Sequence, residues 1–449
     1  MAKYKAYSEY KDSGVEWLGE IPVHWKISPH KHIAYFTKGK KPPILLDVPS
    51  EKTLPYLSME CLRNNVVDKH AIVSTDLRIA LEGQPLIIWD GSNAGEFVKG
   101  RKGILSSTMA TATLYYPLHM QYYWYLCTAI EPDIRKHVTG MGIPHVNGDE
   151  LESIQLSIPS ITEQGYIASF LDHEIAKIDK LIEKQQQLIE LLKEKRQAVI
   201  SHAVTKGLHP DVPMKDSGVE WLGEVPEHWM IAQLKFNTVE MQTGPFGSQL
   251  HAEDYITDGI PLINPAHMNS GKIIPDPQIT VDDATQKRLE RHKLFAGEII
   301  FSRRGELGRC AVVQKKHEGW LCGTGSLKAK LTNKIVPDYA YILISSEGVI
   351  SELTLESKGS TMANLNTETL GRIRLPIPPI SEQNAILDYI NTISDKYDYL
   401  ISSADTAIGL MQERRTAFIS AAVTGKIDVL HWRAPNKHSE TIAEAEVAV

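Results

Sequence analysis

Apolar residues recur at helical spacing along two long segments of the chain. Between residues 162 and 206 they follow one another at intervals of three, four or seven positions, with lysines and glutamates between them. The stripe consists of Ile167, Leu171, Ile175, Ile178, Ile182, Ile189, Leu192 and Val199. A second stripe, between residues 381 and 424, includes Ile386, Ile390, Tyr397, Leu400, Ile401, Ile408 and Met411. Each segment predicts a helix of about 45 residues and about 65 Å, which is typical of a coiled-coil arm.

The ends of the first helix have recognisable signals. Thr162 is a candidate N-cap, and Glu163 adds negative charge to the first turn, where it favours the helix dipole. Gly207 follows the last periodic residue and Gly425 follows the second helix, as expected for glycine just beyond a helix. Ala404 and Ala407 would allow close approach of a partner. We expect the two helices to pair antiparallel within the chain; a plain helical core or a coiled coil between two chains is the alternative.

The segments between these helices favour a mixed α and β structure. Strand-like runs occur at residues 54–58, 85–89, 260–264 and 298–302. Glycine-rich loops at residues 90–95 and 303–308 follow two of these strands. The sequence therefore predicts two α+β domains, over residues 26–155 and 232–374, separated by the long helices.

The chain repeats itself in the same order. Residues 11–27 and 215–231, here called the tryptophan motifs, are identical at fourteen of seventeen positions. Residues 156–164 (LSIPSITEQ) return at 375–383 as LPIPPISEQ, and residues 194–207 return at 413–426, both at an offset of 219. The helical block keeps its length while the preceding segment varies, which is typical of a spacer between loop-bearing scaffolds. By this symmetry, we expect Trp17 and Trp25 near residues 424–432, as Trp221 and Trp229 would be near 205–213.

Composition narrows the function classes. The 449 residues include 48 basic and 55 acidic side chains, which excludes a polybasic coat protein, and 42% hydrophobic content excludes a disordered chain. Positive charge is nevertheless concentrated: residues 25–46 have five lysines and no acid, and residues 286–330 have eleven Lys or Arg against four acids. Such clusters are typical of phosphate contact, although a solvated surface is the commoner meaning of any one cluster. Four scattered cysteines, no secretory signal and no long apolar run favour a cytoplasmic protein.

No catalytic motif is recognisable in either copy. The chain has no GxxxxGK[ST] phosphate loop, no HExxH and no GxSxG, and Asn264-Pro265 lacks the sequel of an amino-methyltransferase motif. We therefore expect no catalytic, cofactor-binding or metal-binding residue on this chain, and a recognition protein rather than an enzyme.

The tryptophan motif, the doubled IPxIxEQ phrase opening a long helix, and the loop Gly244-Pro-Phe-Gly-Ser248 together resemble the specificity subunits of type I restriction–modification systems. The resemblance covers residues 10–430. It implies two target recognition domains held apart by two helices in an antiparallel coiled coil, each reading one half of a split DNA site. In domain terms it implies residues 1–155 and 209–374 as motif plus recognition domain, 156–208 and 375–430 as spacer helices, and 431–449 as a polar tail.

The resemblance also implies partners. Two methyltransferase subunits, which bind S-adenosylmethionine, would dock on the helices, and two motor-nuclease subunits using ATP and Mg²⁺ would join them on double-stranded DNA. The chain itself would be a non-catalytic subunit whose coiled coil sets the half-site spacing. A coiled-coil scaffold joining two protein-binding domains is the alternative, and a self-sufficient nuclease is a third hypothesis.

Candidate DNA contacts come from the basic clusters and from two loops that follow the tryptophan motif at matching places, 36–44 and 242–250. The first loop has Thr37-Lys-Gly-Lys-Lys-Pro42 in place of the Gly-Pro-Phe-Gly-Ser of the second, so a common contact geometry does not follow from the sequence. The candidates are Lys38, Lys40, Lys41, Ser92, Asn93, Lys99, Arg101, Lys102, Phe246, Ser248, Gln249, Arg303, Arg304 and Arg309. We expect Arg303 and Arg304 to project from a loop tip.

Overall fold

The chain divides into two compact units in the computed structural model, which describes residues 4–140, 142–305, 307–356 and 365–433. Unit 1 comprises Met1–Gln186 and Asp405–Val449, and unit 2 comprises Gln187–Ala404. Both boundaries fall inside the long helices, so each unit contains one tryptophan motif, one mixed domain and part of both helices. Most of the predicted polar tail, residues 434–449, lies outside the described residues.

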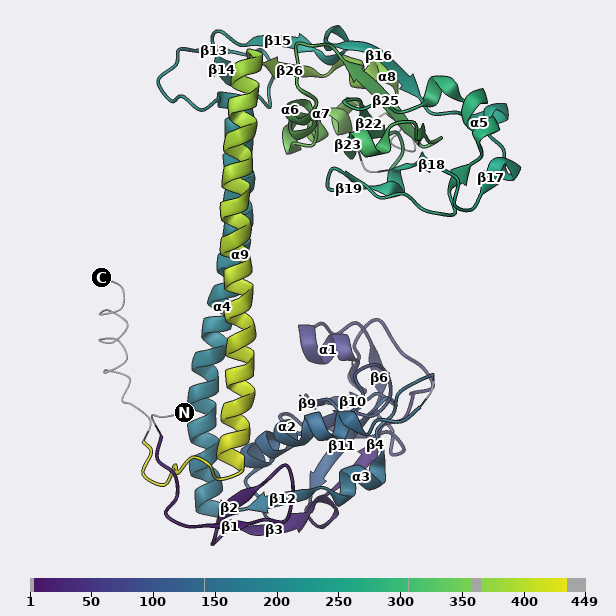
Figure 1. The fold of residues 1–449 in the computed structure, drawn as a ribbon. Helices are drawn as coiled ribbons and strands as arrows, with labels where there is room; N and C mark the ends of the chain where they lie inside the picture. Colours follow the sequence, from purple (N-terminus) through teal and green to yellow (C-terminus); the bar gives the residue numbers. More distant parts are fainter. Residues whose placement is uncertain (1–3, 141, 306, 357–364, 434–449) are drawn as a thin grey trace. The chain divides into compact units, whose positions relative to one another are not determined.

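The two long helices are confirmed as α4 (Ile161–Lys206) and α9 (Ile380–Val423), drawn in Figure 1. The N-cap prediction was wrong by two residues: Ser160, not Thr162, precedes the helix, and its Oγ accepts a hydrogen bond from Glu163 N at 3.3 Å. Gly207 and Gly425 have left-handed backbone angles (φ 79° and 76°) just after the helices, as predicted. The spacing of Gly207 and Gly425 is 218 rather than 219, and α4 has 46 residues against 44 in α9, so the constant offset ends in the last turn.

The helices pair antiparallel within the chain, as predicted. In unit 1 the rings of Phe170 and Phe418 lie 6.3 Å apart, and Asp179 forms an ion pair with Arg415 at 3.1 Å. In unit 2 Arg196 pairs with Asp398 at 2.7 Å. These surface pairs contribute little stability, but they define the register.

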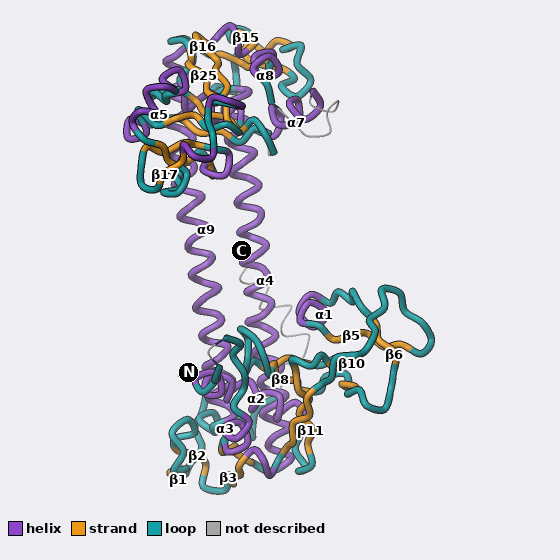
Figure 2. Tube along the Cα trace, turned by 90° about the vertical axis from the view of Figure 1, so that its right-hand side faces the viewer, coloured by secondary structure: helices purple, strands orange, loops and turns teal. Residues whose placement is uncertain are grey.

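The mixed domain of unit 1 contains two four-stranded sheets, in the orders β4-β11-β8-β9 and β6-β5-β10-β7. The first is antiparallel throughout, and the second includes the parallel pair β5 and β10. Figure 2 shows α2 beside β8 and β11, while α1, β5 and β6 lie further from α2. The elements are β3 (Lys26–Pro29), β4 (Ala34–Lys38), β5 (Thr53–Leu57), α1 (Met59–Asn64), β6 (His70–Ile72), β7 (Ile79–Ala80), β8 (Pro85–Ile88), β9 (Phe97–Lys99), β10 (Gly103–Leu105), β11 (Met109–Leu114), α2 (Met120–Lys136), α3 (Gly148–Ser153) and β12 (Gln155–Ile158).

Unit 2 repeats the strand order of the first sheet and retains a parallel pair in the second. Its sheets have the orders β16-β25-β22-β23 and β17-β21-β18-β24, and the parallel pair is β18 with β24. The elements are β15 (Met230–Gln233), β16 (Thr238–Thr243), β17 (Tyr255–Ile256), β18 (Ile260–Ile263), β19 (Met268–Asn269), β20 (Lys272–Ile273), β21 (Thr280–Val281), α5 (Asp283–Arg288), β22 (Ile299–Ser302), β23 (Cys310–Val312), β24 (Leu321–Cys322), β25 (Ser326–Leu331), α6 (Pro337–Ile344), α7 (Glu347–Glu356), α8 (Thr367–Arg372) and β26 (Arg374–Ile377). The four predicted strands are therefore confirmed as β5, β8, β18 and β22.

Each tryptophan motif forms a hairpin, β1 (Tyr10–Asp12) with β2 (Glu20–Pro22) and β13 (Met214–Asp216) with β14 (Glu224–Pro226). The strand that follows each hairpin pairs with the strand that precedes a long helix: β3 with β12, and β15 with β26. The motif is thereby attached to the start of the helix in its own unit.

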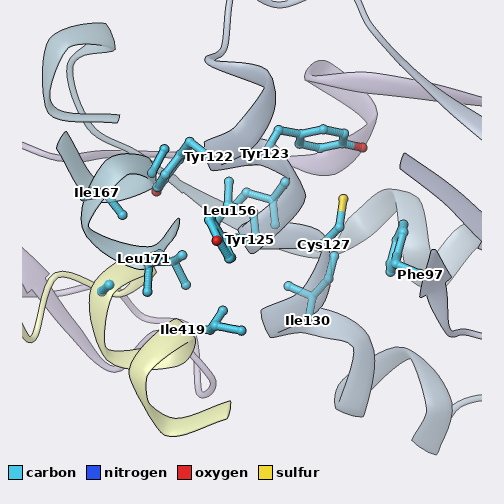
Figure 3. Close-up of a cluster of buried hydrophobic side chains, with 14 of the residues drawn as sticks. Phe97, Tyr122, Tyr123, Tyr125, Cys127, Ile130, Leu156, Ile167, Leu171 and Ile419 are labelled. Carbon is cyan, nitrogen blue, oxygen red and sulfur yellow. The ribbon is translucent and has the colours of Figure 1, made fainter. Parts of the chain in front are cut away.

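A continuous core joins the mixed domain of unit 1 to its helices. Figure 3 shows Tyr122, Tyr125 and Leu156 of the domain converging on Ile167 and Leu171 of α4 and Ile419 of α9. Because these side chains are almost fully removed from water, each contributes on the order of 2 kcal/mol of hydrophobic stabilisation. The domain is thus packed on the helix pair rather than tethered to it.

Candidate nucleic-acid interface

The glutamate of the IPxIxEQ phrase in unit 1 holds the tryptophan motif. Glu163 is buried, and its Oε1 accepts hydrogen bonds from Tyr7 Oη at 2.6 Å and from Trp25 Nε1 at 3.0 Å. His24 Nε2 lies 3.2 Å from Oε2. Burial, together with the hydrogen bond to Glu163, raises the pKa of Tyr7 far above its usual value, so the phenol stays a donor.

Glu382 is the counterpart in unit 2, with fewer partners. Its Oε2 lies 2.8 Å from His228 Nε2. The indole nitrogen of Trp229 is buried and, within the described residues, has no hydrogen-bond partner. The equivalent glutamates therefore share the contact with the motif histidine, and Glu163 adds hydrogen bonds from Tyr7 and Trp25.

The glutamine that follows each glutamate attaches the mixed domain. Gln164 Oε1 accepts from His119 N at 2.8 Å, immediately before α2, while its amide group donates to Pro159 O at 2.9 Å. Gln383 Oε1 accepts from Val336 N at 2.8 Å, immediately before α6, and its amide group donates to Lys334 O and Pro378 O. Both glutamines are buried and bonded through both the oxygen and the nitrogen of the side-chain amide, so the EQ pair links motif, domain and helix at one point.

The expected positions are confirmed for the second tryptophan of each motif, Trp25 and Trp229. A side chain on Gly425 would collide with Pro22 and would lie 3.2 Å from the Trp25 ring, and a Cβ on Gly207 would lie 3.2 Å from the Trp229 ring. Trp17 instead donates to Gln155 O at 3.0 Å, and Trp221 donates to Glu352 at 2.8 Å. Through these hydrogen bonds, Trp17 and Trp221 attach each motif to the mixed domain of its own unit.

One end of the first sheet is built alike in both units. It is the end at which β4 and β8 finish and β11 begins in unit 1, and at which β16 and β22 finish and β25 begins in unit 2; it is here called the loop edge. Gly39 N donates to Met109 O at 2.9 Å, and Gly244 N donates to Ser326 O at 2.9 Å. A Cβ on Gly39 would overlap the carbonyl oxygen of Ser106, and one on Gly244 would overlap that of Gly323. Glycine is required at both positions because the loop crosses a neighbouring turn at backbone contact. The two loops share their geometry here, which their sequences did not predict.

The residue after strand β8 or β22 completes the loop edge. Trp89 N donates to Thr108 O and Arg303 N donates to Gly325 O, both at 2.8 Å. The carbonyl of Trp89 accepts from Val146 N at 2.9 Å, and that of Arg303 accepts from Leu365 N at 2.8 Å. Trp89 and Arg303 therefore occupy the same backbone position with entirely different side chains.

The loop edge of unit 1 brings together several predicted contact residues. Lys38 ends β4, and its Nζ pairs with Asp90 at 2.8 Å and lies 5.7 Å from the centre of the Trp89 ring. Lys40 and Lys41 follow Gly39 and are exposed. Ser92 is exposed and Asn93 half-buried in the loop after β8.

Three other candidates in unit 1 lie away from this edge. Lys99 pairs with Pro85 at the opposite end of β8 from Trp89, and its Nζ contacts Gln121 and the Trp124 ring of α2. Arg101 and Lys102 line a cavity of about 110 Å³ together with Glu82, beside Cys61 of α1. These three cations, predicted like Lys38 to contact DNA, therefore do not lie at the loop edge.

The predicted DNA-contact residues of unit 2 lie on neighbouring loops. Phe246, Ser248 and Gln249 are exposed just after Gly244. Ser248 and Gln249 belong to a short 3-10 helix (Gly247–Gln249), and Gln249 Oε1 accepts a hydrogen bond from the N–H of the preceding Phe246 at 3.2 Å. Arg304 is exposed, as predicted for a loop tip, whereas Arg303 is half-buried, which was not. Arg309 is half-buried and donates to Pro265 O at 3.3 Å.

Sequence reasoning missed the turns that support the loop edge. Carbonyls of residues 106–109 and 323–326 accept the hydrogen bonds from the N–H of the glycine and from the N–H of the residue after β8 or β22. Asn264 Oδ1 accepts from Gly325 N at 3.2 Å and holds the second turn. In the sequence, only the glycines at 323 and 325 indicate such a turn, because a pattern of side chains does not show which backbone carbonyls accept hydrogen bonds.

Some basic side chains of the two clusters, residues 25–46 and 286–330, are buried or paired, so the number of basic residues overestimates the positive surface. Lys328 is buried, with Nζ 3.2 Å from Glu298 Oε1, and it also donates to Lys293 O at 2.6 Å. Arg288 pairs with Asp254 at 2.6 Å, and His30 of the first cluster is buried, with its pKa lowered to about 4 by burial. The two clusters therefore include structural side chains as well as candidate phosphate contacts.

Within the described residues, no group of three or more His, Cys, Asp or Glu side chains could hold a metal ion. In the same part of the chain, no helix is long and apolar enough to cross a membrane.

Comparisons with known proteins agree on one family. Residues 22–191 and 239–400 match the family described as the type I restriction modification DNA specificity domain. The specificity subunit of the type I restriction enzyme MjaVIII of Methanocaldococcus jannaschii is 26% identical over 423 residues, covering 91% of this chain and 94% of that protein. The EcoBI specificity subunit of Escherichia coli is 24% identical, covering 68% of this chain and 64% of that protein.

Solved structures agree in fold. A chain from a study of complex assembly and conformational transition of the type I R-M system matches with a TM-score of 0.63 at 13% identity, covering 90% of this chain and 98% of the other. The HsdS subunit of Thermoanaerobacter tengcongensis matches with a TM-score of 0.50 at 14% identity, covering 91% and 98%.

Proposed function

Because the chain belongs to the type I restriction modification DNA specificity family, we propose that it is the DNA-specificity subunit of such a system. Each unit reads one half of a bipartite site in double-stranded DNA. The chain performs no chemistry of its own. S-adenosylmethionine, ATP and Mg²⁺ belong to its partners, two methyltransferase subunits and two motor-nuclease subunits.

The observation that supports this proposal most directly is the duplicated loop edge. The glycine, the supporting turn and the residue after β8 or β22 have the same backbone hydrogen bonds in both units. Their side chains differ, with Lys38, Trp89 and Asp90 in one unit and Arg303 and Arg304 in the other. A constant scaffold with different side chains suits two readers of different base sequences, because base edges are distinguished by side-chain donors and acceptors.

The paired helices would fix the gap between the half-sites and dock the methyltransferase subunits. Four residues inserted after Gln186, with four inserted opposite in α9 after Ile408, would lengthen each helix by roughly 6 Å. We expect the preferred gap to grow by one or two base pairs, at roughly 3.4 Å each, with both half-site sequences unchanged. An unchanged gap at full activity would show that the helices are mere linkers.

The function is tested by reconstituting the chain with the methyltransferase subunits of its system. We expect specific, salt-sensitive binding to one bipartite site and methylation of adenines within it, whereas the chain alone neither methylates nor cuts DNA. Methyl transfer or cleavage by the chain alone would overturn the proposal. Binding of the complex without any preferred site would instead favour the alternative, a scaffold for two protein-binding domains.

A further inference from the structure

Arg303 differs from the other arginines near the loop edge of unit 2. Its side chain is half-buried, and its Nε is covered by protein without a hydrogen-bond partner in the described part of the chain. The two Nη groups also make no hydrogen bond or ion pair with a described residue, but unlike Nε they are not buried. The stem is therefore fixed while the terminal edge of the guanidinium, with its two parallel donors, stays open to solvent.

The neighbouring arginines lack this combination. Arg309 is half-buried like Arg303, but its Nη1 donates to the Pro265 carbonyl, so part of its donor capacity is used inside the protein. Arg304 is exposed, and its backbone carbonyl accepts a hydrogen bond from Ser302 Oγ at 2.8 Å. A long exposed side chain loses more rotamer freedom on binding than one whose stem is already buried.

The backbone of Arg303 is held on both sides. Its N–H donates to Gly325 O and its carbonyl accepts from Leu365 N, each at 2.8 Å. These contacts place the residue at the junction of β22 with the turn over which Gly244 crosses. A donor fork on a rigid strand end is better defined in position than one on a free loop.

We infer that Arg303 is the specificity-determining side chain of unit 2 and that it reads a guanine, an inference that rests on the proposed function. The guanidinium would donate from Nη1 and Nη2 to guanine O6 and N7 in the major groove. Because Nε is covered, the contact is made end-on. Trp89, at the same backbone position in unit 1, has one indole donor and no fork. The guanine requirement at this position therefore belongs to the half-site of unit 2 alone.

The test uses the complete chain with its methyltransferase subunits, after the wild-type site has been mapped by sequencing methylated adenines. Binding is measured to that site and to a panel in which each base pair of both half-sites is replaced singly. Arg303→Ala and Arg303→Lys are compared with Arg304→Ala, and thermal unfolding of each variant checks the fold. The lysine variant keeps the charge but cannot donate through a planar fork.

For the wild type we expect discrimination at one guanine of one half-site. Arg303→Ala should reduce that discrimination roughly 5- to 150-fold and leave every other position unchanged. Arg303→Lys should lose much of it as well, whereas Arg304→Ala should weaken binding evenly, if at all. Retained discrimination in Arg303→Ala, or an even loss over all positions in both Arg303 variants, would overturn the inference. If instead the wild-type complex had no bipartite site, the proposed function itself would fail.

Discussion

Trp25 and Glu163, 138 positions apart in the chain, form a hydrogen bond of 3.0 Å from the indole Nε1 to Oε1. The bond fixes the N-terminal tryptophan motif to the first turn of α4, and the Trp25 ring also lies beside Gly425, just beyond the end of α9. The corresponding indole of Trp229 in unit 2 has no such bond to a described residue, although its motif is nearly identical. Both glutamates contact the histidine of their own motif, His24 or His228, but only Glu163 also accepts a hydrogen bond from a tyrosine outside the motif, Tyr7.

Replacing Glu163 should therefore destabilise unit 1 more than the matched change destabilises unit 2. Glu163→Ala leaves the buried donors of Tyr7 and Trp25 without an acceptor, which costs about 1–3 kcal/mol for each. Glu382→Ala removes only a partner of the half-exposed His228, so its cost should be below about 1 kcal/mol. Chemical denaturation of both variants measures the two costs. Equal losses would show that the hydrogen bonds to Glu163 do not hold the motif.

The buried His30 should make stability depend on pH. Burial lowers its pKa to about 4 in the folded chain, against about 6.5 when unfolded. Between these values the unfolded state binds more protons, so the stabilisation is complete above about pH 6.5 and is lost as pH falls toward 4, by up to roughly 3 kcal/mol.

The residue at this position in unit 2 is Leu234, whose backbone makes the same hydrogen bond, to Ile373 O, as His30 makes to Ile154 O. His30→Leu, combined with Tyr123→Phe to avoid an unbonded hydroxyl, should flatten the fall in urea midpoint between pH 7 and 5. An unchanged slope in the double variant would assign the pH dependence to other groups.

Breaking the buried pair Lys328–Glu298 should destabilise the fold strongly, whereas replacing both of its residues together should destabilise it much less. Lys328→Met alone leaves an unpaired buried carboxylate, with an expected loss of about 3–5 kcal/mol. Unit 1 has neutral residues at these places, Thr111 and Gln84, so Lys328→Thr with Glu298→Gln should cost much less than the single change. Thermal unfolding of the two variants gives the comparison. A double variant as unstable as the single one would mean that the ion pair itself, not the unpaired charge, stabilises unit 2.

The two crossing glycines should be needed for reading, each in its own half-site. Gly39→Ala and Gly244→Ala place a Cβ against a backbone carbonyl, so the loop edge must shift. We expect each variant to lose discrimination at one half-site only, measured by binding to singly substituted sites. Gly165→Ala in α4 is the matched control, since nothing lies within 4 Å of its added Cβ. Loss at both half-sites from either variant would contradict independent readers.

The periodic and repeated parts of the structure could be predicted from the sequence, and the loop edge could not. Helices α4 and α9, their antiparallel pairing and strands β5, β8, β18 and β22 follow from apolar spacing, because burial imposes a period. Gly39 and Gly244 stand in loops of unlike sequence, and their equivalence depends on carbonyls of distant turns. Charge counting likewise could not separate Lys328, buried against Glu298, from exposed lysines, since pairing depends on the register of β22 and β25.

Each mixed domain is expected to read its own half-site, and a duplicated domain tests this most directly. Residues 232–374 would be replaced by a second copy of residues 26–155, keeping both tryptophan motifs, both EQ pairs and both long helices. Methylated-adenine sequencing of DNA from a host with the complete system would then report the site. We predict that the half-site of unit 1 appears on both sides of the gap and that the half-site of unit 2 is lost. Methylation of the original asymmetric site by the duplicated chain would contradict the account.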